Sequence, residues 1–152
     1  MNNLYLYIFA IIAGMLIPIQ AASNIFLNRF TGNILYSSLI LISIGLLFLI
    51  LLIIFLKPTP PSFGEVLRAP IFSYVGGVII IIYIITITSI APKLGVGSAV
   101  LLIVISQIFS SAIIDHIGLF GLPILPFNYK KLAGLICVIA GLILINHDKL
   151  GN

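Results

Sequence analysis

The stretch Gly14–Asn28, GMLIPIQAASNIFLN, lies inside an apolar run that starts at Leu4 and is long enough to cross a bilayer. It nevertheless contains three carboxamide side chains, Gln20, Asn24 and Asn28. The amides follow one another at intervals of four residues, so on a helix they form a single polar stripe. Because polar groups in hydrocarbon need a partner in protein or in a water-filled cavity, the stripe predicts one wall of a cavity. Amides that only bond neighbouring helices together are the alternative.

A proline in the same run predicts a bend in this first helix. Pro18 has no backbone N–H, so the carbonyl oxygen of Gly14 loses its usual helical partner. Sharp kinks in long helices occur at such positions. We therefore expect Gly14 and Pro18 to form a hinge, and a static bend is the simpler interpretation.

The composition is that of an integral membrane protein. Of the 152 residues, 62% are hydrophobic and only 7% are charged, whereas soluble domains have about 45–50% apolar and about 25% charged residues. The net charge of +4 comes from Lys and Arg residues scattered along the chain. Since they form no basic stripe, we expect the lipid bilayer as a partner and not nucleic acid.

Five apolar segments are long enough to span a membrane, which takes about 20 residues. They cover about residues 4–28, 34–56, 70–90, 96–115 and 130–146. Because these runs are continuous and not alternating, we expect an all-α polytopic bundle of five transmembrane helices, in one membrane domain of residues 1–152. A tight turn is expected at residues 91–95, and a long polar loop at residues 57–69.

The positive charges are almost evenly divided between the two sides of this bundle. On the side of the N-terminus lie Lys57, Arg68, Lys130 and Lys131, and on the opposite side, here the far side, lie Arg29, Lys93 and Lys149. The slight excess places the N-terminus in the cytoplasm. The near-balance also permits insertion in both orientations and pairing with an inverted copy, so single and dual topology both remain open.

Uncharged polar side chains gather in the half of the bundle toward the far side. They are Gln20, Asn24 and Asn28 of the first span, Ser37 and Ser38 of the second, and Thr86, Thr88 and Ser89 of the third. Tyr83, Ser106 and Gln107 lie nearer the middle. A vestibule that opens on the far side and narrows near Gln107 would explain this distribution. The competing interpretation is that Ser and Thr bond to carbonyl groups of their own helices.

An ionisable pair, Asp115–His116, stands at the end of the fourth span. Carboxylates near the membrane interior are functional candidates, so Asp115 and His116 are predicted to gate or couple transport. Ser111 lies one helical turn earlier on the same face as Asp115. A role at the helix end, or a salt bridge to Lys130 or Lys131, is the alternative.

Two glycines of the fifth span predict a close helix contact. Gly134 and Gly141 stand seven residues apart and therefore share a helix face. Small residues on one face let two helix backbones approach closely. The spacing alone does not distinguish a contact within one chain from a contact between two chains.

The sequence contains no nucleophile–base set, no metal-ligand cluster and no phosphate-binding loop, so we expect neither an enzyme nor a cofactor. The leading hypothesis is a secondary transporter that moves a small polar or amphipathic metabolite by alternating access. The expected substrate-binding residues are Gln20, Asn24, Tyr83, Gln107 and Ser111. The competing hypothesis is a membrane scaffold or regulatory subunit that transports nothing.

Motifs of small and polar residues extend over nearly the whole chain. They are Gly14-x3-Pro18-x-Gln20-x3-Asn24, Gly76-Gly77 with Tyr83, Pro92-x2-Gly95, Ser106-Gln107-x2-Ser110-Ser111-x3-Asp115-His116-x-Gly118-x2-Gly121, and Gly134-x6-Gly141. In this combination they resemble the YdcZ family, the five-helix branch of the drug/metabolite transporter superfamily in the bacterial inner membrane. The segment from Gln107 to Gly121 is the most specific part of the resemblance.

The resemblance implies that this chain is one half of a ten-helix inverted-repeat transporter. It would then work as an antiparallel homodimer or with a sister chain. The spacing of Gly134 and Gly141 is similar to that of the dimer-helix glycines in the small multidrug resistance relatives. Those relatives have a membrane-embedded glutamate where this chain has Gln20, and this departure argues against proton-coupled multidrug efflux.

Overall fold

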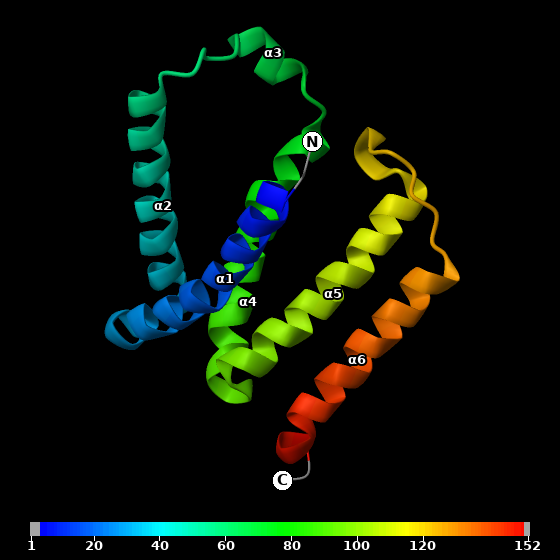
Figure 1. The fold of residues 1–152 in the computed structure, drawn as a ribbon. Coiled ribbons are helices and arrows are strands. Elements are labelled where there is room, and N and C mark those ends of the chain that lie inside the picture. Colours follow the sequence, from blue (N-terminus) through cyan, green and yellow to red (C-terminus); the bar gives the residue numbers. More distant parts are fainter. Residues whose placement is uncertain (1–3, 151–152) are drawn as a thin grey trace. The chain divides into compact units, whose positions relative to one another are not determined.

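The chain is all-helical in the computed structural model, which describes the backbone of residues 4–150 and the side chains of residues 4–141, 143 and 144 (Figure 1). The elements within this range are α1 (Leu4–Thr31), α2 (Ile34–Leu56), α3 (Phe63–Arg68), the 3-10 helix η1 (Ile71–Tyr74), α4 (Val75–Leu94), α5 (Val96–Ile117), the 3-10 helix η2 (Leu119–Gly121) and α6 (Tyr129–Leu150). The prediction of an all-α fold is confirmed.

Four helical segments among the described residues are long and apolar enough to cross a membrane. They are α1, α2, the continuous segment Ile71–Leu94, and α5, with lengths of 28, 23, 24 and 22 residues. The polytopic character is therefore confirmed. The fifth predicted span coincides with α6, but several of its side chains lie outside the described residues, and its crossing of the membrane stays a prediction.

The tight turn predicted for residues 91–95 was wrong. Helix α4 continues through Pro92 to Leu94, and Gly95 alone separates it from α5. A proline this close to a helix end costs only the hydrogen bond to the carbonyl of Thr88, so the helix can continue past it. The break comes at Gly95, whose φ of 84° lies in a region that other residues rarely adopt.

The long loop predicted for residues 57–69 contains a short helix, α3, that the prediction missed. Ser62 and Glu65 form a capping box at its start: the hydroxyl of Ser62 accepts from the Glu65 N–H at 3.2 Å, and the Glu65 carboxylate accepts from the Ser62 N–H at 2.9 Å. These hydrogen bonds from Ser62 hold the pKa of the exposed Glu65 carboxyl below its usual value. The Ser-x-x-Glu pattern was a readable signal for this helix start.

Residues 1–93 form one compact unit and residues 94–152 form another. In the first unit, α1 and α2 are joined by a turn at Gly32 and Asn33, and the side-chain oxygen of Asn33 accepts from the Leu35 N–H at 2.9 Å to cap α2. The hydroxyl of Ser37 donates to the Asn28 side-chain oxygen at 3.3 Å across this turn. In the second unit α5 and α6 lie side by side (Figure 1).

Burial in the first unit is concentrated at one end of the helices. The buried residues are Ala21, Asn24 and Ile25 of α1, Ser37 and Ser38 of α2, and Ile84, Ile87, Thr88 and Ala91 of α4. Because successive spans run in opposite directions, these positions all lie toward the far side of the membrane. The interior of this unit therefore coincides with the region that was predicted to collect uncharged polar groups.

Gly118 is expected to tolerate no side chain, because it ends α5 with a φ of 63° and a Cβ there would lie 2.7 Å from Cγ1 of Ile124 and 3.0 Å from the Leu122 carbonyl oxygen. We expect Gly118→Ala to lower the free energy of unfolding by about 2–3 kcal/mol, from backbone strain plus overlap. Gly121 is the matched control, since its φ is 75° but a Cβ would meet nothing within 4 Å.

Gly121→Ala should therefore cost only the backbone strain, about 1 kcal/mol. Equilibrium unfolding of both variants in mixed detergent micelles measures the difference. Equal losses at the two positions would show that the contact with Ile124 and Leu122 has no energetic weight.

Candidate functional site

One amide of the polar stripe on α1 is buried in the protein. Asn24 is only 3% exposed, whereas Gln20 and Asn28, one turn away on either side, are half-buried. Pro18 lies within α1 and is half-buried, and the ribbon of α1 changes direction along its length (Figure 1). Gly14 is exposed, and a Cβ there would meet nothing within 4 Å. The sequence-predicted stripe and hinge residues thus all belong to one continuous helix.

Three buried side chains of the first unit have polar atoms that no protein group satisfies. Among the described residues these atoms are Nδ2 and Oδ1 of Asn24, Oγ of Ser38 and Oγ1 of Thr88. Ser38 is 6% exposed and Thr88 is 2% exposed, so neither can reach surrounding solvent easily. A buried polar group without a partner costs roughly 1–3 kcal/mol. These three side chains therefore have hydrogen-bonding capacity that the chain itself does not use.

Other hydroxyl groups of the spans bond to their own helices. Ser89 donates to the Ile85 carbonyl at 2.7 Å, Ser106 to the Leu102 carbonyl at 2.9 Å, and Ser111 to the Ile108 carbonyl at 2.9 Å. For these residues the competing interpretation of the polar side chains is confirmed. The contrast sets apart Ser38 and Thr88, which make no such bond.

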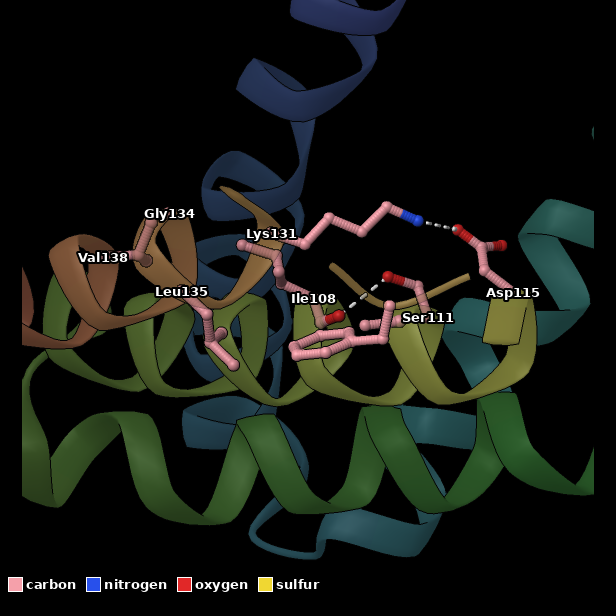
Figure 2. A pocket seen from close by; sticks show the side chains of 9 residues that line it. Ile108, Ser111, Asp115, Lys131, Gly134, Leu135 and Val138 are labelled. Carbon is pink, nitrogen blue, oxygen red and sulfur yellow. Dashed lines mark hydrogen bonds and ion pairs between the residues drawn. The ribbon is translucent and has the colours of Figure 1, made fainter. Parts of the chain in front are cut away.

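A groove of about 340 Å³ lies between α5 and α6 in the second unit (Figure 2). Its walls are mainly apolar, with a polar end; the lining residues are Ile108, Ser111, Ala112, Asp115, Phe127, Lys131, Gly134, Leu135 and Val138. Two predicted residues, Ser111 and Asp115, are brought together here. Lys131 was not predicted as a groove residue, although its charge and its place at the start of the last span were visible in the sequence.

The polar end of the groove is built by hydrogen bonds that fasten the α5–α6 connection. The Lys131 ammonium lies 3.9 Å from Oδ2 of Asp115 (Figure 2). It also donates to the Leu125 carbonyl at 3.3 Å. The Leu125 N–H in turn donates to the Asp115 carbonyl at 2.8 Å. His116, in the last turn of α5, accepts the Phe127 N–H on Nδ1 at 3.1 Å. The alternative of a salt bridge between Asp115 and Lys131 is therefore confirmed.

Comparison with known proteins supplies the family. Residues 5–144 match the family described as "Putative inner membrane exporter, YdcZ". The chain belongs to the YdcZ family. No curated protein and no solved structure matches it.

Membership of the YdcZ family, together with the apolar helices, makes the chain a multi-pass protein of the bacterial inner membrane. The matched range includes the first-helix motif, the Gln107–Gly121 segment and Gly134 with Gly141. The resemblance drawn from those motifs is therefore confirmed, and the description of the family as exporters agrees with a role in transport.

The sequence-predicted site residues of this YdcZ protein are divided between the two compact units. Gln20, Asn24 and a half-buried Tyr83 belong to the first unit. The second unit contains the groove and an exposed Gln107. Sequence reasoning placed Ser38 and Thr88 in the polar region but did not single them out, since hydroxyl groups usually bond to their own helix. No group of three His, Cys, Asp or Glu in the described part of the chain could hold a metal.

The Asp115–Lys131 pair of this YdcZ protein is expected to contribute less than about 1 kcal/mol to stability, because its side chains are 40% and 36% exposed and their charges stand 3.9 Å apart. A double-mutant cycle with Asp115→Asn and Lys131→Met, followed by equilibrium unfolding in micelles, measures the coupling free energy. A coupling above about 2 kcal/mol would contradict this expectation and indicate that lipid removes both charges from water.

Proposed function

We propose that this YdcZ protein is a secondary exporter that moves a small polar or amphipathic metabolite across the inner membrane by alternating access. The observation that carries the proposal is Asn24, a buried amide on a membrane-spanning helix with no partner on either of its polar atoms. An amide that served only to join helices would be bonded to a neighbouring helix. A solute that passes through the site would supply the missing hydrogen bonds.

Helix α1 has the features that a moving element needs. Asn24 follows Pro18 by six residues on the same helix. Pro18 leaves the Gly14 carbonyl without its helical hydrogen bond, which lowers the cost of bending at this point. The half of α1 that carries Asn24 can therefore change its angle to the other half. Discontinuous or bent helices at the binding site are a recurring feature of secondary transporters.

Each unit is proposed to contact the solute through its own residues. They are Gln20, Asn24 and Tyr83 in the first unit, and Gln107 and Ser111 in the second. Asp115 and His116 would act as the gate, because both fasten the α5–α6 connection beside the groove. Opening of this gate would break the Lys131 pair, the Phe127 hydrogen bond and the bonds that Leu125 makes to Asp115 and Lys131.

A single chain is proposed to be half of the working transporter, completed by an antiparallel second copy or a sister chain. Gly134 is exposed on α6, and a Cβ at Gly134 or at Gly141 would meet nothing within 4 Å. Gly134 also lines the α5–α6 groove, and the space beside both glycines is open in the single chain. Glycines at this spacing favour close packing against another helix.

Replacement of the buried amide should abolish transport. Asn24→Leu removes the hydrogen bonds that the Asn24 amide makes to the solute and keeps a similar side-chain size, so we expect export to fall by about tenfold or more, which corresponds to the loss of about 1.4 kcal/mol or more of binding. The measurement uses proteoliposomes loaded with the small-molecule fraction of a ¹³C-labelled bacterial extract, and mass spectrometry of the solutes released.

Ile19→Leu is the control for that experiment, since Ile19 is an exposed residue of the same helix. It should leave the released solutes unchanged. If Asn24→Leu lowers thermal stability and the protein-dependent release stays at the native rate, Asn24 is an interhelical contact and the scaffold function is favoured.

The dimer has its own test in Gly134→Ile. Because a Cβ at Gly134 meets nothing in the chain, the variant should fold normally while the added side chain prevents close approach of a second helix. Single-molecule photobleaching in nanodiscs should show mostly one chain per disc for this variant and two for the native protein. Gly45→Ile on α2, where a Cβ also meets nothing within 4 Å, is the matched control. A dimeric Gly134→Ile variant would remove this face from the interface.

A further inference from the structure

The unpartnered polar atoms of the first unit are all uncharged. An amide at Asn24 and hydroxyls at Ser38 and Thr88 offer donors and acceptors, and all three side chains are more than nine-tenths buried. They come from α1, α2 and α4, and each lies in the half of its helix toward the far side. The unpartnered atoms can therefore donate and accept hydrogen bonds, but none of them carries a full charge.

The charged residues of the first unit all lie at helix ends or in the loop. They are Arg29, Lys57, Glu65, Arg68 and Lys93. Glu65 is the only carboxylate among them, and its oxygens accept the hydrogen bonds that cap α3. A cation placed beside Asn24 would thus have no counter-charge in this unit. Burial of an unpaired charge costs several kcal/mol, so the interior is unfavourable for charged solutes of either sign.

Two positively charged side chains lie at the end of the unit where the unpartnered side chains are. Arg29 and Lys93 stand in the last turns of α1 and α4, and both are exposed. Each follows a buried polar residue, Asn24 or Thr88, by five residues, which is about 7.5 Å along a helix. Positive charge at this end of the unit lowers the local concentration of cations and raises that of anions.

We propose that Asn24 and Ser38, on the packed helices α1 and α2, and Thr88 on α4 are binding positions for an uncharged hydrogen-bonding group, such as the hydroxyls or amide of a neutral solute. These positions reject cations most strongly, because both the charged end of the unit and the interior disfavour them, and anions less strongly, because only the interior does. This inference rests on the proposed function, since it names the substrate class of that exporter.

The test is the charge preference of thiol labelling at these positions. Cys137, the only cysteine, is first replaced by Ser, and Ser38→Cys and Thr88→Cys are then made separately in that background. Purified protein in nanodiscs is labelled with three methanethiosulfonate reagents of similar size: hydroxyethyl (neutral), sulfonatoethyl (anionic) and trimethylammonioethyl (cationic). Rates are divided by those at Thr59→Cys in the exposed loop, which corrects for the intrinsic reactivity of each reagent.

The expected order at both positions is neutral, then anionic, then cationic, with the neutral reagent at least tenfold faster than the cationic one. Cationic labelling as fast as neutral labelling would overturn the proposal. Absence of labelling in folded protein that labels fully after denaturation would also overturn it, because no solute could then reach these atoms. Two positions are used so that misfolding of one variant does not decide the result.

Different outcomes would reject the exporter and the neutral binding positions. Loss of the expected charge order while Asn24→Leu still abolishes export would reject the neutral binding positions and leave the exporter standing. The expected charge order without any solute release that depends on Asn24 would reject the exporter.

Discussion

The organisation of this protein depends on the absence of water from the hydrocarbon core, which leaves protein to satisfy polar groups that water would otherwise solvate. Several hydroxyls of the spans, such as those of Ser89 and Ser106, meet this demand within their own helices. Asn24 does not, and neither do Ser38 and Thr88. A passing solute or bound water would supply the hydrogen bonds that these three side chains lack.

The helices could be predicted well because length and apolarity decide them in a membrane. The span predicted for residues 34–56 coincides with α2, Ile34–Leu56. The errors occur at the ends, where one hydrogen bond or one backbone angle decides. A tight turn was predicted at residues 91–95, although a proline in the last turn of a helix removes a single hydrogen bond. The capping box of α3 was overlooked because it stands in a polar stretch that was predicted to be a loop.

The candidate site could be predicted only in part. The amide stripe on α1 was evident from spacing, and Asn24 is indeed its most buried member. The alternatives for Asp115 could not be separated, because the distance to a lysine depends on how the α5–α6 connection folds back. In the structure Leu125 bonds to both Asp115 and Lys131, which brings the two charges together. No periodic pattern in the sequence predicts that the α5–α6 connection folds back in this way.

The short turn between α1 and α2 also matters for how the protein is made. Gly32 and Asn33 alone connect a helix that carries three amides and a proline to one with no charged residue in its 23 positions. The mean hydropathy of the most apolar part of α2 is 3.4, against 2.0 for α1, so we expect α2 to partition into lipid more readily and the short turn to keep α1 beside it. The bond between Ser37 and Asn28 then ties the pair at its base. The amides of α1 can thus enter the membrane because the next helix in the chain, α2, is more apolar.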